Sequence, residues 1–187
     1  VIDLCSQLKD KLNYQFKNPD LLELALTHRS ANSTNNERLE YLGDAILGFV
    51  IAEVLYQKFK DGPEGILTRK RASLVKKDSL AMLARELDLG KHIHLGSGER
   101  KSGGWRRDSI LANTLEAVIG AIYLDSDFDT CRQFIVQLYA RLVNSLTLDD
   151  SGKDSKTELQ EYLQARKLDL PTYQVIAEEG EAHAKTF

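Results

Sequence analysis

Three acidic residues recur at helical spacing in one segment of this 187-residue chain and could together hold a metal ion. Glu37, Glu40 and Asp44 are three and four positions apart, so in a helix they lie within about 60° of one another. Like charges at this spacing repel by about 0.2–0.5 kcal/mol per pair, and a divalent cation would remove that repulsion. Carboxylate oxygens favour Mg²⁺ or Mn²⁺ over zinc. A solvated acidic helix face is the commoner meaning of such a pattern, and acids also suit the first turn of a helix.

A second segment, Ile110–Leu124, is almost entirely apolar but carries Asn113 and Glu116 one turn apart. A glutamate in so apolar a helix is costly to bury unless an arginine or a cation pairs with it. Two crossing helices that each offer oxygen ligands would form the cage that metal-assisted phosphoryl chemistry needs. We therefore predict that this pair joins Glu40 and Asp44 around a divalent cation.

Basic residues gather in two segments that could hold a phosphate backbone. Residues 69–77 include five Lys and Arg, and the glycine-rich stretch Gly96–Gly104 is followed by Trp105, Arg106 and Arg107. Taken alone, each segment is more often a solvated basic face than a binding site. The glycine stretch lacks the Gly-Lys-Ser/Thr ending of a P-loop, so it gives only weak support to nucleotide binding.

Length and composition limit the architecture. At about 150 residues per domain, the chain holds one domain and a smaller piece. The longest apolar runs, Ala45–Ala52 and Ala117–Leu124, have eight residues each, far short of the ~20 that span a bilayer. Two distant cysteines, Cys5 and Cys131, exclude a disulfide scaffold, and we expect no export leader. We expect a cytoplasmic protein with no membrane partner.

The elements that must position these residues are helices. The periodicity predicts helices over 37–59, 67–77, 109–124 and 128–146, shorter ones after Asn18-Pro19 and from Asp78, and a loop over 96–104. We expect Asn36 and Asp108 to cap the helices that follow them. The run Ala45–Ala52 is apolar all round, so its own core or a partner chain must cover it.

The character of the sequence changes after residue 148. Residues 149–154 have no apolar side chain and are typical of a linker. A capping box opens a helix at Ser155, and alternation from Tyr173 predicts a strand, with a second from residue 183. We predict a first domain over 1–148, a linker over 149–154 and an incomplete second domain over 155–187.

The segment Asn36-Glu-Arg-Leu-Glu-Tyr-Leu-Gly-Asp-Ala-Ile-Leu47 closely resembles the signature of the ribonuclease III family. Residues 25–30, 64–65, 101–104, 108–112 and 115–117 also agree with bacterial ribonuclease III in sequence order. Residues 154–163 and 171–173 resemble the start of its double-stranded RNA-binding domain. The resemblance implies an all-α endonuclease domain, a helical bundle that works as a homodimer. The N-terminal part of an α+β double-stranded RNA-binding domain would follow it.

The resemblance also implies an activity. It is the Mg²⁺-dependent hydrolysis of double-stranded RNA to 5′-phosphate and 3′-hydroxyl ends, with Mn²⁺ able to substitute, in the processing of rRNA and other structured RNA precursors. The metal ligands would be Glu40, Asn113 and Glu116, and the catalytic residues Asp44 and Glu116. Substrate contacts are expected from Glu37, Glu64, Arg69, Arg71, Arg106, Arg107 and Gln160.

Asn113 departs from the family pattern, which usually has Asp at this position. An amide oxygen can coordinate Mg²⁺ but is neutral, so the site would lose one negative charge. That loss would weaken metal affinity unless Glu37 offsets it. Two alternatives therefore stay open: a double-stranded RNA-binding protein that no longer cuts, and a helical dimer whose acidic face docks a basic protein.

Overall fold

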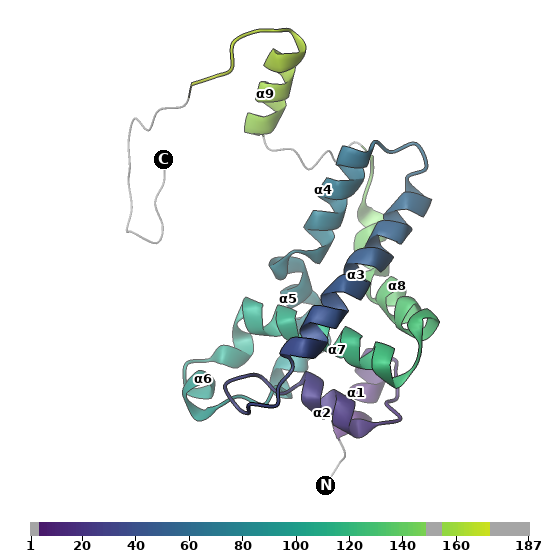
Figure 1. The fold of residues 1–187 in the computed structure, drawn as a ribbon, viewed down its shortest axis with the longest axis vertical. Helices are drawn as coiled ribbons and strands as arrows, with labels where there is room; N and C mark the ends of the chain where they lie inside the picture. Colours follow the sequence, from purple (N-terminus) through teal and green to yellow (C-terminus); the bar gives the residue numbers. More distant parts are fainter. Residues whose placement is uncertain (1–3, 149–154, 173–187) are drawn as a thin grey trace. The chain divides into compact units, whose positions relative to one another are not determined.

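The computed structural model describes residues 4–148 and 155–172, and its regular structure over these residues is helical (Figure 1). The chain divides into two compact units, Val1–Ser151 and Gly152–Phe187. The second unit contains α9 (Ser155–Ala165). The first contains α1 (Leu4–Leu12), α2 (Pro19–Ala25), α3 (Glu37–Lys58), α4 (Glu64–Val75), α5 (Lys77–Glu86), α6 (Ser97–Lys101), α7 (Asp108–Asp125), α8 (Phe128–Ser145) and the 3-10 turns η1 (Leu89–Lys91) and η2 (Gly104–Arg106).

The all-α prediction for the first domain is confirmed over the described residues. The predicted linker and the strands expected from residue 173 onward lie outside them. Helices α3, α7 and α8 have bounds close to those predicted, whereas α4 begins at Glu64, three residues before the expected start. It follows Pro63, whose fixed φ suits the start of a helix. Across residues 4–148 and 155–172, no helix has the length and apolar character needed to cross a bilayer.

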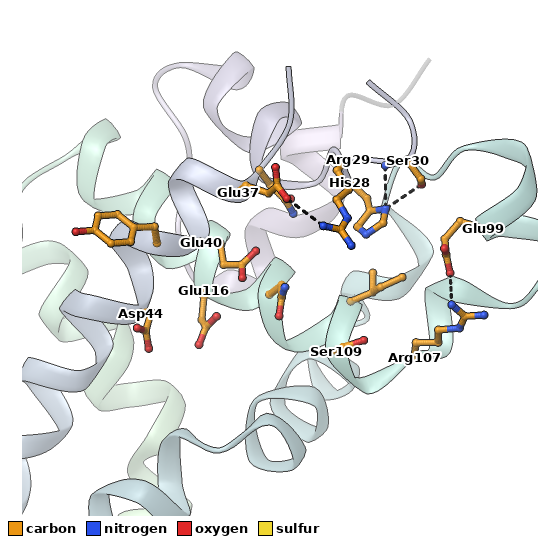
Figure 2. Close-up of a pocket in the computed structure, with 14 residues that line it drawn as sticks. His28, Arg29, Ser30, Glu37, Glu40, Asp44, Glu99, Arg107, Ser109 and Glu116 are labelled. Carbon is orange, nitrogen blue, oxygen red and sulfur yellow. Dashed lines mark hydrogen bonds and ion pairs between the residues drawn. The ribbon is translucent and has the colours of Figure 1, made fainter. Parts of the chain in front are cut away.

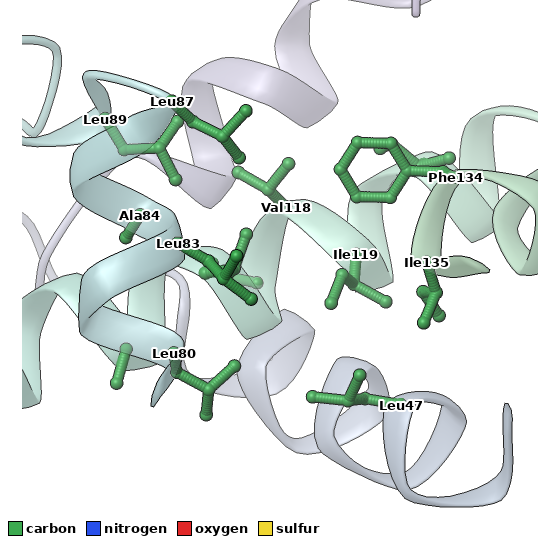
Figure 3. Packing of buried hydrophobic residues seen from close by; sticks show 14 of the residues in the cluster. Leu47, Leu80, Leu83, Ala84, Leu87, Leu89, Val118, Ile119, Phe134 and Ile135 are labelled. Carbon is green, nitrogen blue, oxygen red and sulfur yellow. The ribbon is translucent and has the colours of Figure 1, made fainter. Parts of the chain in front are cut away.

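Helix α7 lies at the centre of the first unit and is buried on most sides, because its sequence is apolar nearly all round. Figure 3 shows Leu80 and Leu83 of α5 packed on one side of α7, and Phe134 and Ile135 of α8 on the other. Leu47 of α3 is fully buried in the same core. The core thus fixes α7 in place, and α7 carries two of the predicted metal ligands.

Helices α3 and α7 cross in direct backbone contact, and two glycines make that contact possible. A Cβ atom on Gly43 would lie 1.8 Å from the carbonyl oxygen of Glu116. One on Gly120 would lie 2.4 Å from the carbonyl oxygen of Leu39. Both distances are far below van der Waals contact, so only glycine fits at either position. The acidic face of α3 is thereby held against α7 near Glu116.

Two of the expected helix caps are wrong. Asn36 occupies the N-cap position of α3, but its side chain is buried and donates to the carbonyl oxygen of Ala25 at 3.1 Å. It ties α3 to α2 instead of capping its own helix. Asp108 is the first residue of α7 rather than the residue before it, and its carboxylate pairs with Arg85 of α5.

The glycine-rich stretch is not the open loop that its composition predicts. It folds into α6 and η2, and its glycines are needed for close packing. A Cβ on Gly96 would lie 2.2 Å from the carbonyl oxygen of Ser30, and one on Gly104 would lie 2.6 Å from Oε1 of Glu99. Only Gly103 has the positive φ, +77°, that favours glycine for its backbone.

Candidate active site

A cleft of about 1040 Å³ opens where α3 crosses α7 (Figure 2). Successive turns of α3 present acidic side chains to the cleft, and α7 lines it from the other side. The cleft brings together five residues that the sequence singled out: Glu37, Glu40, Asp44, Asn113 and Glu116. Its far end is formed by the segment 28–30 and by Glu99, Arg107, Ser109 and Ile110.

Two carboxyl groups in this cleft, those of Glu40 and Glu116, resist ionisation. Burial, together with the charges of Asp44 and Glu40, raises the pKa of Glu116 to about 7. Burial also raises the pKa of Glu40, and the charges of Glu37 and Asp44 add to the effect. A hydrogen bond from Asn113 acts in the opposite direction on Glu40. The cleft therefore holds more negative charge than its surroundings compensate, and a bound cation would supply the missing positive charge.

The chemical type of the donor atoms in the cleft suits a hard divalent cation. Three carboxylates and one amide oxygen are the ligands that Mg²⁺ and Mn²⁺ prefer, and the cleft offers no thiolate or paired imidazoles that would suit zinc. Within residues 4–148 and 155–172, however, no three His, Cys, Asp or Glu side chains lie close enough to enclose an ion as they stand. Ligation therefore requires these side chains to draw together around the cation.

The other predicted contact residues are spread over the surface. Arg107 lines the cleft and pairs with Glu99 at 2.7 Å. Arg106 instead lies over the ring of Trp105, 4.1 Å from its centroid. Further predicted contacts lie elsewhere: Glu64, Arg69 and Arg71 on α4, where Glu64 and Arg71 line a separate hollow, and Gln160 on α9 in the other unit. Within one chain, Glu64 therefore does not line the cleft that contains Glu37.

Several residues of the cleft were missed from the sequence. His28, Arg29 and Ser30 form its wall opposite Asp44, and Glu99 faces them from α6 (Figure 2). An isolated parallel bridge between Thr27 and His94 brings these two segments together. Segments joined in this way have no periodicity that could reveal their pairing. The only signal was that residues 25–30 resemble a family segment.

Comparison with known proteins agrees with this geometry. A family model described as Ribonuclease-III-like matches residues 18–145, which include every residue of the cleft. Ribonuclease 3 of Hahella chejuensis is 56% identical over 181 residues, covering 97% of this chain and 80% of that protein. Ribonuclease 3 of Azotobacter vinelandii is 57% identical over 182 residues, with the same coverage of each.

The chain belongs to the ribonuclease III family. It is therefore an endoribonuclease of a family whose members are generally metal-dependent. The nuclease domain of ribonuclease III from Campylobacter jejuni has the same fold, with a TM-score of 0.74 and 40% identity, covering 78% of this chain and all of that domain. A second structure of that domain, described as flexible in a region involved in dimer formation, has a TM-score of 0.71 and 43% identity, covering 72% of this chain and 95% of that one. Dicer from Pichia stipitis, at 23% identity and a TM-score of 0.60, shares the fold.

Proposed function

We propose that this ribonuclease III family member hydrolyses double-stranded RNA with Mg²⁺ held in the cleft between α3 and α7. The observation that carries the proposal is the convergence of three carboxylates from two helices, where burial and the charges of Asp44 and Glu40 raise the pKa of Glu116 to about 7. A site of this kind is stable when a cation joins it. Mn²⁺ should substitute, because it prefers the same oxygen ligands.

Each residue has a distinct task in this mechanism. Glu40, Glu116 and the amide oxygen of Asn113 would hold the cation, which polarises the scissile phosphate and acidifies water when bound. Asp44 is exposed and lines the cleft, where its carboxylate can orient the attacking water and accept its proton. The water oxygen joins phosphorus as the bond from phosphorus to the 3′ oxygen breaks, and the departing oxygen takes a proton from solvent. The products are a 5′-phosphate and a 3′-hydroxyl.

The amide of Asn113 would restrain Glu40 before the cation binds. Its hydrogen bond to Glu40 opposes the rise in pKa that burial causes, so it favours the ionised form of Glu40 that can ligate a cation. The same amide brings no negative charge of its own. We therefore propose that the site is active but binds its metal ion more weakly than it would with a carboxylate at position 113.

The test is cleavage of a long RNA duplex with and without Mg²⁺. Glu116→Gln keeps the size of the side chain but removes a charged ligand, and it should cost about a thousandfold in rate while duplex binding persists. Glu86→Gln, on α5 and paired with Arg141, is the matched control and should cut normally. If the unaltered chain binds duplex but never cuts it in Mg²⁺ or Mn²⁺, it is a non-cutting RNA-binding protein and the proposal fails.

We further propose that the chain acts as a homodimer through one face of α3. Tyr41, Phe49 and Tyr56 are 80%, 59% and 73% exposed on this face, which is unusual for large aromatic side chains. Phe49 packs edge-on against Phe128 of α8, so the patch extends onto a second helix. Beside it lies a largely apolar hollow of about 420 Å³ whose lining includes Glu64. A second copy of the chain bound to this face would lie next to Glu64 of α4.

The dimer can be tested by molar mass in solution. Phe49→Asp with Tyr56→Asp places two charges in the patch and should yield a monomer. Lys101→Glu, on the exposed surface of α6, changes charge elsewhere and should leave the dimer intact. A monomeric unaltered chain at micromolar concentration would contradict this proposal.

For the second unit we propose the start of a double-stranded RNA-binding domain, with Gln160 of α9 contacting the RNA backbone. Structured precursors such as those of rRNA are the substrates that we expect for the whole enzyme. Gln160→Ala should weaken duplex binding without changing the position of cleavage.

A further inference from the structure

The ring of His28 is held on the wall of the cleft by a short chain of hydrogen bonds (Figure 2). The backbone N–H of Gly96 donates to Oγ of Ser30 at 3.0 Å, and that oxygen lies 2.8 Å from Nδ1 of His28. The backbone N–H of Ser30 also donates to Nδ1, at 3.2 Å. Because a backbone N–H can only donate, Nδ1 must accept and carries no proton. In a neutral ring the hydrogen is then on Nε2.

The ring is neutral near pH 7. Burial lowers its pKa below the ordinary value of 6.5, and the charge of Arg29 adds to this. The charges of Glu99 and Glu37 oppose the change but do not reverse it. His28 therefore presents one N–H donor, on the edge of the ring turned away from Ser30 and toward the cleft (Figure 2). Among the residues that the structure describes, none accepts a hydrogen bond from Nε2.

The backbone around His28 is equally restrained. Its own N–H donates to the carbonyl oxygen of His94 at 3.0 Å, and the N–H of His94 donates to Leu26 at 2.8 Å. Gly96 lies so close to Ser30 that a Cβ there would collide with the carbonyl oxygen of Ser30. The donor is thus fixed in direction before any ligand arrives, which favours its use in binding.

Nearby cations are already compensated. Arg29 lies 3.5 Å from Glu37, and Arg107 lies 2.7 Å from Glu99, so each has a carboxylate beside it. The Nε2–H of His28 has no such partner in the part of the chain that the structure describes. It is a neutral donor at the opposite wall of the cleft from the acidic Asp44.

We propose that His28 is a substrate-binding residue that donates its Nε2–H to an oxygen of the RNA backbone beside the bond to be cut. This inference rests on the proposed function and adds a contact on the wall of the cleft opposite Asp44. The acceptor is a ribose 2′-oxygen or a non-bridging phosphate oxygen, since both accept from a neutral donor. Ser30 is then a positioning residue that orients the ring.

Binding measured without cleavage separates this inference from the proposed function. In the Glu116→Gln background, with Mg²⁺ present, the affinity for a fluorescent RNA duplex is measured by anisotropy. Adding His28→Ala should weaken binding by about three- to tenfold, the usual effect of one lost hydrogen bond. His28→Gln should restore most of it, because its amide N–H can occupy nearly the same place. Ser30→Ala should give a smaller loss.

The matched control is His94→Ala, which removes an exposed histidine outside the cleft and should bind like its parent. Equal binding by His28→Ala and its parent would overturn the inference. The inference would also be overturned if His28→Gln bound the duplex as weakly as His28→Ala while both variants kept the melting temperature of the parent. Loss of the hydrogen-bond donor would then not be the cause of the weaker binding. A failure of the unaltered chain to cut RNA would count against the proposed function and leave this binding result intact.

The two acceptors are distinguished by a chemical change in the RNA. A duplex with 2′-deoxyribose at the nucleotides flanking the cut lacks the 2′-oxygen there. If His28 contacts that oxygen, the losses from the deoxy duplex and from His28→Ala do not multiply. If it contacts a phosphate, the two losses multiply.

Discussion

Replacing Gly43 with alanine tests whether the helix crossing positions the metal ligands. The new Cβ would lie 1.8 Å from the carbonyl oxygen of Glu116, whereas ordinary contact begins at about 3.4 Å. The obstacle is backbone, so no side-chain rotation relieves it, and the two helices must separate locally by about 1.6 Å. Metal ligands tolerate displacements of only about 0.2 Å.

We expect two effects of Gly43→Ala. Overpacking should lower the free energy of unfolding by about 1–3 kcal/mol, partly offset by the ~1 kcal/mol that alanine gains over glycine in a helix. Because Glu40 and Asp44 move with α3, cleavage should fall by about a hundredfold or more even where the protein stays folded. Urea unfolding gives the first quantity, and duplex cleavage at saturating Mg²⁺ gives the second.

The control for this prediction is Gly98→Ala in α6, where a Cβ meets nothing within 4 Å. It adds the same methyl group to a helix, so we expect little change in the free energy of unfolding and no change in cleavage activity. A Gly43→Ala variant that cuts RNA at the unaltered rate with unaltered stability would refute the claim that close backbone contact sets the site.

Three further changes probe the charge balance and the core. Asn113→Asp adds a fourth carboxylate to the predicted ligands, so calorimetric titration should show Mg²⁺ binding about tenfold tighter. Equal or weaker binding would show that the amide of Asn113 does not limit the affinity for Mg²⁺. Glu116→Gln should raise the free energy of unfolding by about 1–2 kcal/mol at pH 8 but not at pH 4. The reason is that a pKa raised to about 7 in the fold takes stability away as pH rises from about 4.5 through 7; a substitution that changes the free energy of unfolding by the same amount at both pH values would contradict the pKa. Tyr139→Phe removes a hydroxyl that is buried without a hydrogen-bond partner in the described part of the chain, so thermal unfolding should show a gain of about 1 kcal/mol, and a loss would reveal a partner for it.

The sequence predicts the helices of this fold well because their apolar positions repeat at helical spacing. The same periodicity places Glu40 and Asp44 on one face of α3, and the apolar surroundings of Glu116 indicate that it needs a partner. What periodicity does not predict is which helices cross. The crossing depends on Gly43 and Gly120. A side chain at either position is excluded only because the backbone of the other helix lies against it.

The far wall of the cleft was missed for a related reason. It is built from short irregular segments joined by a single β-bridge at Thr27 and His94, and such contacts leave no pattern along the chain. The glycine-rich composition of residues 96–104 predicts a loop, but Gly96 and Gly104 are there because neighbouring atoms leave no room for a side chain. Composition distinguishes poorly between these two uses of glycine.

The central claim is that carboxylates from α3 and α7 converge to hold a divalent cation, and the ionisation of Glu116 reports on it most directly. A carbon-detected NMR titration of the Glu116 carboxyl should give a pKa of about 7 without divalent ions. With saturating Mg²⁺ the pKa should fall below its ordinary value of 4.5, because the cation stabilises the charged form. A pKa that Mg²⁺ leaves unchanged would contradict the claim.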